Sequence, residues 1–213
     1  MGTKSFSINE AVNFGWRTVK KRFWFFVQIF IIVALIAYGP GVIMQSFDKV
    51  ELPTLVAMFF FLAGIIFWVV QLLISIGLIQ VVLAHVDSRK SDVSDLFTGT
   101  KFLVNYFLSS LAFGLVTGVG ILLLVIPGLI LIVRLQFYPY LIVDKGVGPI
   151  EALKGSWNMT AGSFWNLVLL ALAAVGINML GAVALGIGLL WSIPTTVLAV
   201  GWVYRRLSQH AHA

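Results

Sequence analysis

The sequence predicts an all-α polytopic membrane protein, and three observations lead to this fold class. Hydrophobic residues make up 60% of the 213-residue chain, charged residues only 10%, and the mean hydropathy is +1.03. A soluble domain has about 45–50% apolar and about 25% charged residues, so this chain has too few charges to cover a surface that faces water. The apolar residues also form long uninterrupted runs, as membrane-spanning helices require. The whole chain, 1–213, is expected to form a single membrane domain.

Six transmembrane helices in three hairpins are expected, because a bilayer core of about 30 Å needs roughly 20 apolar helical residues. The apolar runs 102–143 and 164–204 are each long enough for two crossings, so each must contain a turn. We expect the first turn at Ile126-Pro127-Gly128, with 118–120 as the alternative, and the second turn near 186–188. The approximate spans are 23–44, 54–84, 102–126, 129–143, 164–185 and 189–204.

The distribution of basic residues predicts that both termini lie in the cytoplasm. With six spans, twelve of the fourteen Lys and Arg residues fall on one side of the membrane. Lys49 falls on the other side, and Arg134 falls inside a span. The positive-inside rule assigns the basic side to the cytoplasm.

Two segments on the basic side have the pattern of short amphipathic helices. The first opens with the capping box Ser7-Ile8-Asn9-Glu10, and apolar residues then recur at helical spacing. We expect this helix to lie on the membrane surface, and the alternative is a helix packed on another cytoplasmic segment. The second segment follows Pro149 and has the same character.

The two amphipathic segments belong to an internal repeat with an offset of 141 residues. The shared pattern is Glu-Ala, four residues, Trp, six residues, Phe-Trp, which pairs Trp16 with Trp157 and Trp24 with Trp165. These four tryptophans are expected to anchor the protein at the membrane interface. A weaker third unit lies between the two, and all three units run in the same direction. The predicted units are approximately 7–85, 92–143 and 150–206.

Arg134 is the charged residue expected inside a span, where a charge is costly and by default indicates function. It is a candidate for binding a lipid phosphate or another anion, with its side chain reaching toward the outer interface. The alternative is a structural arginine that snorkels or satisfies carbonyl groups freed at Pro127. Other polar residues inside the spans are expected mainly to form hydrogen bonds between helices. These candidates are Gln71, Gln80, Gln136, Asn166 and Asn178.

The sequence offers no candidate catalytic residue, no metal site and no cofactor site. It contains no cysteine and three histidines, and it lacks the nucleotide-binding, hydrolase and metalloprotease motifs. Asp144 and Glu151 are the acidic pair around which an enzymatic site would have to form. The expected partners are membrane lipids and, as an option, other membrane or cytoplasmic proteins, but not nucleic acid. The sequence leaves the oligomeric state open.

Residues 123–170 resemble a known group of membrane domains. The residues that carry the resemblance are Ile-Pro-Gly-Leu-Ile at 126–130, Tyr-Pro-Tyr-Leu-Ile-Val-Asp at 138–144 and Gly-Pro-Ile-Glu-Ala-Leu-Lys-Gly-Ser-Trp at 148–157. They resemble the membrane domain of some glycerophosphoryl diester phosphodiesterases and of related YciC-like uncharacterised prokaryotic families. The resemblance implies a six-helix protein of the prokaryotic cytoplasmic (inner) membrane. It implies no activity, because this chain lacks the acidic and histidine residues of the separate phosphodiesterase domain.

These observations together predict a non-enzymatic integral membrane protein that is a lipid-interacting or scaffolding subunit of a membrane assembly. The cationic side, the surface segments with their tryptophans and the lack of catalytic groups favour this function. The alternative is a small transporter or permease with a polar path that reaches Arg134.

Overall fold

The structure is a computed structural model, and it describes residues 6–45, 53–184 and 186–210. These residues form α-helices and two short 3-10 helices, and they contain no β-strand. In chain order the elements are α1 (Ile8–Lys21), α2 (Phe23–Gln45), α3 (Thr54–Val86), η1 (Val93–Phe97), η2 (Thr100–Phe102), α4 (Leu103–Leu123), α5 (Val125–Leu135), α6 (Tyr138–Lys145), α7 (Pro149–Met159), α8 (Phe164–Val183) and α9 (Leu189–His210).

Five segments of the described chain are long and apolar enough to cross a membrane. They are Phe23–Val42, Thr54–Val86, Val93–Leu123, Val125–Lys145 and Phe164–Val183. The sixth predicted span, 189–204, corresponds to α9, which is not among them. Ser192, Thr195 and Thr196 make the first half of α9 more polar than the other spans, and their side chains are buried. The polar groups of α9 are therefore covered by neighbouring helices.

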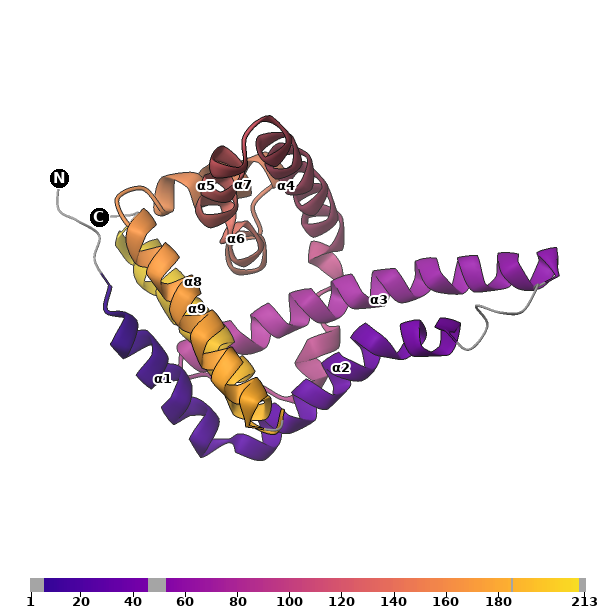
Figure 1. Cartoon of the computed structure of the whole chain (residues 1–213), viewed down its shortest axis with the longest axis horizontal. Helices are drawn as coiled ribbons and strands as arrows, with labels where there is room; N and C mark the ends of the chain where they lie inside the picture. Colours follow the sequence, from indigo (N-terminus) through magenta and orange to yellow (C-terminus); the bar gives the residue numbers. More distant parts are fainter. Residues whose placement is uncertain (1–5, 46–52, 185, 211–213) are drawn as a thin grey trace.

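α9 packs against helices from distant parts of the chain. α1 packs along α9 in the opposite direction, and α2, α3 and α8 contact α9 as well (Figure 1). The buried face of α1 consists of Ala11, Gly15 and Val19, at intervals of four residues. A Cβ atom at Gly15 would collide with the carbonyl oxygen of Thr195, so only glycine permits this approach. The first amphipathic segment therefore packs on α9, which the sequence predicts as a span and not as a cytoplasmic segment.

The start of α1 agrees with the predicted cap, because the Ser7 hydroxyl oxygen accepts a hydrogen bond from the Glu10 amide at 3.3 Å. Glu10 is the third residue of α1, and Glu151 is the third residue of α7. Likewise, Phe23 begins α2 and Phe164 begins α8. The residues paired by the repeat thus occupy equivalent places in their helices.

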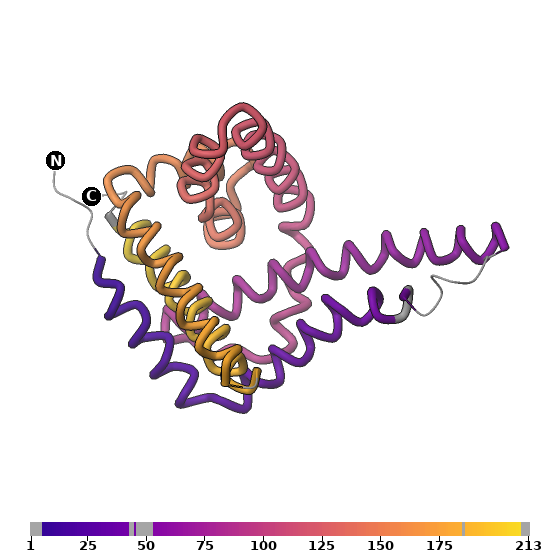
Figure 2. The backbone as a smooth tube through the Cα atoms, in the orientation of Figure 1, coloured from indigo at the N-terminus to yellow at the C-terminus, as the bar shows by residue number. Residues whose placement is uncertain are grey.

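The short helices pack on longer helices in a cyclic order. η1 packs on α3, α7 packs on α4, α5 and α6, and α1 packs on α9. η1 and α7 begin the second and third predicted repeat units, and each contacts the unit before its own. α1 begins the first unit and contacts the last unit. In Figure 2, α2 and α3 extend away from the other helices, whereas α8 and α9 run side by side.

The turn between α4 and α5 lies at Leu124, so the expected turn at Ile126-Pro127-Gly128 is wrong by two residues. Leu124 is extended, with φ −159° and ψ 129°, and the alternative turn at 118–120 lies inside α4. Pro127 falls in the first turn of α5, where its missing amide leaves no bond unmade. Gly128 instead allows α5 to approach the backbone of Ile121.

The predicted span 129–143 consists of two helices, because α5 ends at Leu135 and α6 begins at Tyr138. A proline at the start of α6 cannot donate the amide hydrogen bond that would continue α5. α7 satisfies the backbone groups at this break: the Ser156 hydroxyl donates to the Arg134 carbonyl at 2.8 Å and accepts from the Phe137 amide at 3.1 Å. The predicted turn near 186–188 agrees with the interval between α8 and α9, where Gly186 has φ 76°.

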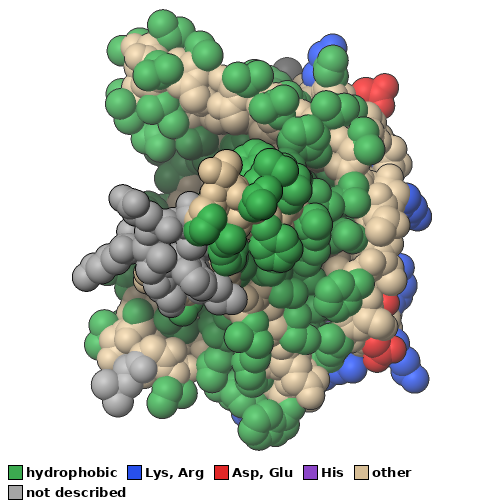
Figure 3. Space-filling model, turned by 90° about the vertical axis from the view of Figure 1, so that its right-hand side faces the viewer, with side chains coloured by type: hydrophobic (Ala, Val, Ile, Leu, Met, Phe, Trp, Pro, Cys, Tyr) green, Lys and Arg blue, Asp and Glu red, His purple; other side chains and the backbone are tan. Residues whose placement is uncertain are grey.

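Charged and apolar side chains occupy different parts of the surface. Figure 3 shows the Lys, Arg, Asp and Glu side chains gathered along one edge, whereas most of the remaining surface in this view is hydrophobic. Large apolar side chains are exposed along α2, α3, α4, α5 and α8. Such a surface is unsuited to water and indicates contact with the hydrocarbon of a membrane.

Candidate functional site

A polar cleft lies where the end of α3, the segment that contains η1 and η2, and the end of α6 meet. It encloses about 780 Å³, its open mouth included. Its lining residues are Gln80, Leu83, Ala84, Arg89, Lys90, Asp95, Thr98, Lys101, Phe102, Val143 and Asp144. We call this site the polar cleft.

The end of α3 directs two basic residues to the polar cleft. Ser88 follows the helix in the left-handed conformation with φ 56°, and the Arg89 amide donates to the Ala84 carbonyl at 2.7 Å. This turn ends the helix and places Arg89 and Lys90 at the cleft. A left-handed residue other than glycine costs roughly 1–2 kcal/mol, and such strained residues cluster at functional sites.

The segment containing η1 and η2 forms the opposite wall of the polar cleft. The Asp92 amide donates to the Asp95 carboxylate at 3.0 Å, which closes a capping box at the start of η1. The Thr98 hydroxyl donates to the Gln80 side-chain oxygen at 3.1 Å and so ties this wall to α3. Gly77 permits the close approach of η1, because a Cβ atom there would collide with the backbone of Leu96.

A partly buried ionic cluster adjoins the polar cleft through Asp144 and Arg89. The Arg205 guanidinium bonds to Asp144 at 2.9 Å and 3.1 Å and to Asp87 at 2.7 Å. The Tyr204 hydroxyl donates to Asp144 at 2.7 Å, and Arg89 reaches Asp87 at 3.0 Å. Burial lowers the pKa of Arg205, but the carboxylates of Asp144 and Asp87 raise it by more, so this pKa lies above its ordinary value. We call this group the Arg205 clamp, because it joins the ends of α3, α6 and α9.

The acidic residues of the polar cleft are already engaged, whereas two of its cations are not. Asp95 accepts its capping bond, and Asp144 is held by the Arg205 clamp. Lys90 and Lys101 are exposed, and neither forms a salt bridge within the described part of the chain. Lys101 lies over the ring of Phe102, 4.8 Å from its centre. The polar cleft therefore presents free ammonium donors of the kind that bind anions.

Arg134 does not line the polar cleft. Its guanidinium carbon lies 4.2 Å from the centre of the Trp157 ring on α7, a cation–π contact. The side chain is half-buried and packs on α7.

Two of the predicted in-span residues join neighbouring helices. The Gln71 amide donates to the carbonyls of Ile36 and Ala37, both at 3.3 Å, and so connects α3 to α2. The Asn178 amide donates to the Thr196 hydroxyl at 3.3 Å and connects α8 to α9.

The other three in-span candidates have different surroundings. Gln80 lines the polar cleft, Gln136 donates to the nearby Val133 carbonyl at 2.8 Å, and Asn166 is half-buried near the start of α8. In the described residues, no hydrogen bond joins any two of the five candidates.

The predicted interface tryptophans lie on the short helices and at the starts of α2 and α8. Trp24 and Trp165, which the repeat pairs, are 75% and 74% exposed. Trp16 packs on Trp191 with 5.2 Å between ring centres, and Trp157 packs under the guanidinium described above. The anchoring role of the two exposed rings stays a prediction.

Sequence reasoning missed Lys90 and Lys101 as site residues, although it used them for topology. The available signal was that basic residues flank the short acidic segment 92–95, which itself has the spacing of a helix cap. Contacts between distant parts of the chain place the two lysines at one cleft with the end of α6, and no local sequence pattern predicts such contacts.

Curated relatives of the chain come from mycobacteria. The chain is 29% identical over 168 residues to "Uncharacterized protein Rv2560" of Mycobacterium tuberculosis and 28% identical over 168 residues to "Uncharacterized protein Mb2590" of Mycobacterium bovis. Each match covers 79% of this chain but 51% of the relative, so the chain spans about half the length of the curated relatives it matches. No solved structure matches the chain.

These relatives support an uncharacterised family, and they give no support to a link with glycerophosphoryl diester phosphodiesterases. With the exposed apolar helices, they indicate a membrane-embedded protein of bacteria. The family profile described as "Domain of unknown function (DUF7847)" matches residues 66–204, which include the polar cleft and Arg134. The chain therefore belongs to the DUF7847 family.

Proposed function

We propose that this protein is a non-enzymatic integral membrane protein that binds membrane lipids, as a lipid-interacting or scaffolding subunit of a membrane assembly. It would lie in the bacterial cytoplasmic membrane with both termini in the cytoplasm. The polarity of the surface supports this placement, because the charged edge and the exposed apolar helices match an interface and a hydrocarbon core.

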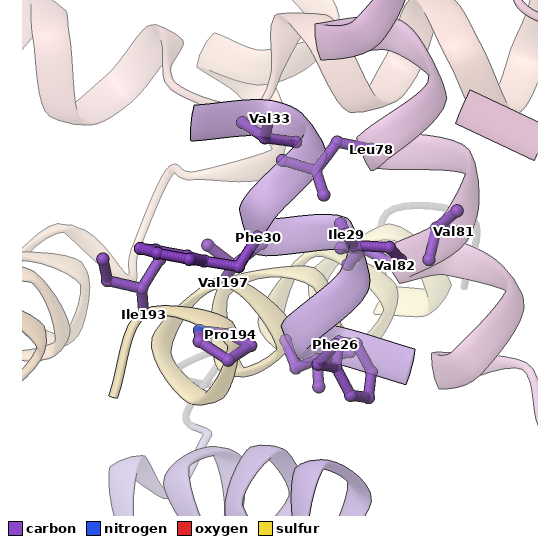
Figure 4. A pocket seen from close by; sticks show the side chains of 11 residues that line it. Phe26, Ile29, Phe30, Val33, Leu78, Val81, Val82, Ile193, Pro194 and Val197 are labelled. Carbon is purple, nitrogen blue, oxygen red and sulfur yellow. The ribbon is translucent and has the colours of Figure 1, made fainter. Parts of the chain in front are cut away.

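The observation that carries the proposal is an apolar groove between α2, α3 and α9. It encloses about 460 Å³, its open side included. In Figure 4, side chains from α2 face side chains from α3 and α9 across this space. All of its lining residues are apolar: Phe26, Ile29, Phe30, Val33, Leu78, Val81, Val82, Ile193, Pro194, Val197 and Leu198.

The chemistry of this groove favours a lipid acyl chain as its occupant. A polar ligand would lose its hydrogen bonds to water and gain none, which costs roughly 2–7 kcal/mol for each amide or hydroxyl group. An acyl chain loses nothing, and the dispersion contacts with the groove walls favour its binding. The groove residues of α2 and α3 lie within candidate membrane spans, and in a membrane acyl chains would surround the opening of the groove.

Extraction from native membranes in a mild detergent, followed by mass spectrometry of the retained lipids, tests the proposal. We expect the purified protein to retain lipid, and Val197→Phe, which fills the groove, to retain less. Leu35→Phe is the control, because Leu35 lies on α2, one of the helices that form the groove, but is exposed outside the groove. A wild-type protein that carries no lipid, or equal retention by both variants, would contradict the proposal.

A small transporter is the second proposal, and buried polar groups between α8 and α9 favour it. The Asn178 oxygen and the hydroxyls of Ser192 and Thr195 are buried without a hydrogen-bond partner within the described residues. Water or a polar solute could satisfy them. This proposal also requires a path to Arg134, so Arg134→Ala should fold normally but abolish substrate flux in reconstituted vesicles. Unchanged flux would exclude a path through Arg134.

A further inference from the structure

We propose that the polar cleft binds the phosphodiester group of an anionic membrane lipid, held by the ammonium groups of Lys90 and Lys101. This inference rests on the proposed lipid-binding function, but it concerns a different site from the apolar groove. Residues 78, 81 and 82 of α3 line the groove, whereas residues 80, 83 and 84 line the polar cleft. At helical spacing these two sets lie on opposite faces of α3.

The two lysines approach the polar cleft from different walls. Lys90 belongs to the turn that ends α3, and Lys101 belongs to η2. Each wall is fixed: the Ala84–Arg89 backbone bond closes the first, and the Thr98–Gln80 bond holds the second. The protein therefore arranges the two cations before a ligand arrives, which lowers the entropy cost of binding.

The charge of the polar cleft matches a phosphodiester, which carries one negative charge. Three basic and two acidic residues line the site, so its formal charge is +1. Arg205 and Asp87, which bond to lining residues, add one charge of each sign and leave this value unchanged. A phosphodiester would neutralise the site, whereas a dianionic free phosphate would leave an excess negative charge beside Asp95 and Asp144.

The walls of the polar cleft favour a lipid over a soluble anion. Leu83, Ala84, Phe102 and Val143 form a buried apolar inner wall beneath the charged rim. Two residues beyond Phe102, α4 begins to expose apolar side chains, and Val104 is 68% exposed. A lipid headgroup in the polar cleft could thus place its acyl chains along α4. The predicted cytoplasmic position supports this ligand, because that leaflet carries anionic lipids.

Reconstitution in bilayers of phosphatidylcholine with a minor fraction of phosphatidylglycerol tests this inference, with native mass spectrometry to count retained phosphatidylglycerol. We expect Lys90→Gln combined with Lys101→Gln to lower phosphatidylglycerol retention by about 25-fold, since each cation close to the lipid headgroup contributes about fivefold. Lys20→Gln combined with Lys21→Gln removes the same charge from the exposed end of α1 and should change retention little. Circular dichroism and thermal unfolding would verify that both variants fold.

Each outcome decides between the ligand sources and between the two proposals. Displacement of phosphatidylglycerol by inorganic phosphate would overturn the inference in favour of a soluble anion, whereas resistance to phosphate supports a lipid. Equal retention by the lysine variants and the wild type would overturn the polar cleft as the site while leaving the lipid-binding function standing. Failure of the proposed function looks different, because the wild-type protein would then retain no lipid of any kind.

Discussion

Single residues in this protein act mainly by compensating for charges and for interruptions of the helices. Arg205 neutralises two carboxylates at once, and Ser156 satisfies the backbone groups exposed where α5 gives way to α6. Both residues bond to partners distant in sequence. Their substitution is therefore expected to affect the whole fold and not only one helix.

Removal of the Arg205 clamp should destabilise the protein. Arg205→Gln leaves Asp144 and Asp87 without their shared cation. The side chains of Arg205, Asp144 and Asp87 are only 22%, 17% and 26% exposed, respectively. The expected loss is about 2 kcal/mol, between the values for exposed and fully buried ion pairs. Thermal and denaturant unfolding in detergent would measure it. Arg206→Gln, at the exposed neighbouring residue, is the control, and an equal loss from that variant would contradict the clamp.

The contact between Arg134 and Trp157 should also contribute to stability. A double-mutant cycle with Arg134→Met and Trp157→Leu isolates the interaction, because methionine keeps much of the arginine's apolar stem. We expect a coupling energy of about 1 kcal/mol, typical of a partly buried cation–π pair. Additive effects of the two substitutions would show that the observed stacking contributes nothing, and Arg134 would then need another explanation.

At the scale of elements, glycines set how closely the short helices approach the long ones. Gly15 brings α1 onto α9, and Gly77 brings η1 onto α3. In both cases a Cβ atom would meet backbone, which cannot move aside as a side chain can. The apolar and polar patterns that predict the helices are therefore insufficient to predict how they pack.

Gly15→Ala should loosen the contact between α1 and α9. Because the added methyl group would collide with the Thr195 carbonyl oxygen, we expect a loss of about 2 kcal/mol in unfolding free energy. Gly114→Ala is the matched control, since nothing lies within 4 Å of its Cβ position. That variant should be neutral or gain up to about 1 kcal/mol from helix propensity. Thermal unfolding of the two variants side by side would decide, and equal stability would refute the close approach.

At the scale of the whole molecule, α9 combines the length of a membrane span with buried polar residues. Its length is sufficient for a crossing at 1.5 Å per residue, but its polar residues lower its hydropathy. Burial of those residues against other helices removes the penalty that lipid contact would impose. A helix in such a position can therefore span a membrane although its composition alone does not indicate it.

Cysteine labelling can settle the topology, because the chain contains no cysteine. We expect Ile187→Cys, between α8 and α9, to react with a membrane-impermeant maleimide on intact cells. Lys90→Cys and Gln209→Cys should react only after lysis, because the basic side is expected in the cytoplasm. The unsubstituted chain serves as the unlabelled control. Labelling of Ile187→Cys and Gln209→Cys from the same side would show that α9 does not cross.

Much of the helical framework was predictable because it depends on neighbouring residues. The Ser7 cap, the apolar runs and the matched starts of α2 and α8 all follow from local pattern. The turn before α5 was misplaced because the Pro-Gly pair fits two roles locally. Only packing against Ile121 shows that Gly128 serves helix contact instead of the turn.

The sequence by itself determined that this is a membrane protein of apolar helices with a cationic side, since composition and local spacing encode both properties. Only the tertiary structure decided that Lys90 and Lys101 share one cleft, that α9 packs against α1, α2, α3 and α8, and that Arg134 stacks on Trp157. The physical reason is distance along the chain. Asp87, Asp144 and Arg205 are far apart in sequence and form their ion pairs only because the helices that carry them pack together. This packing depends on close backbone contacts, which no short stretch of sequence encodes.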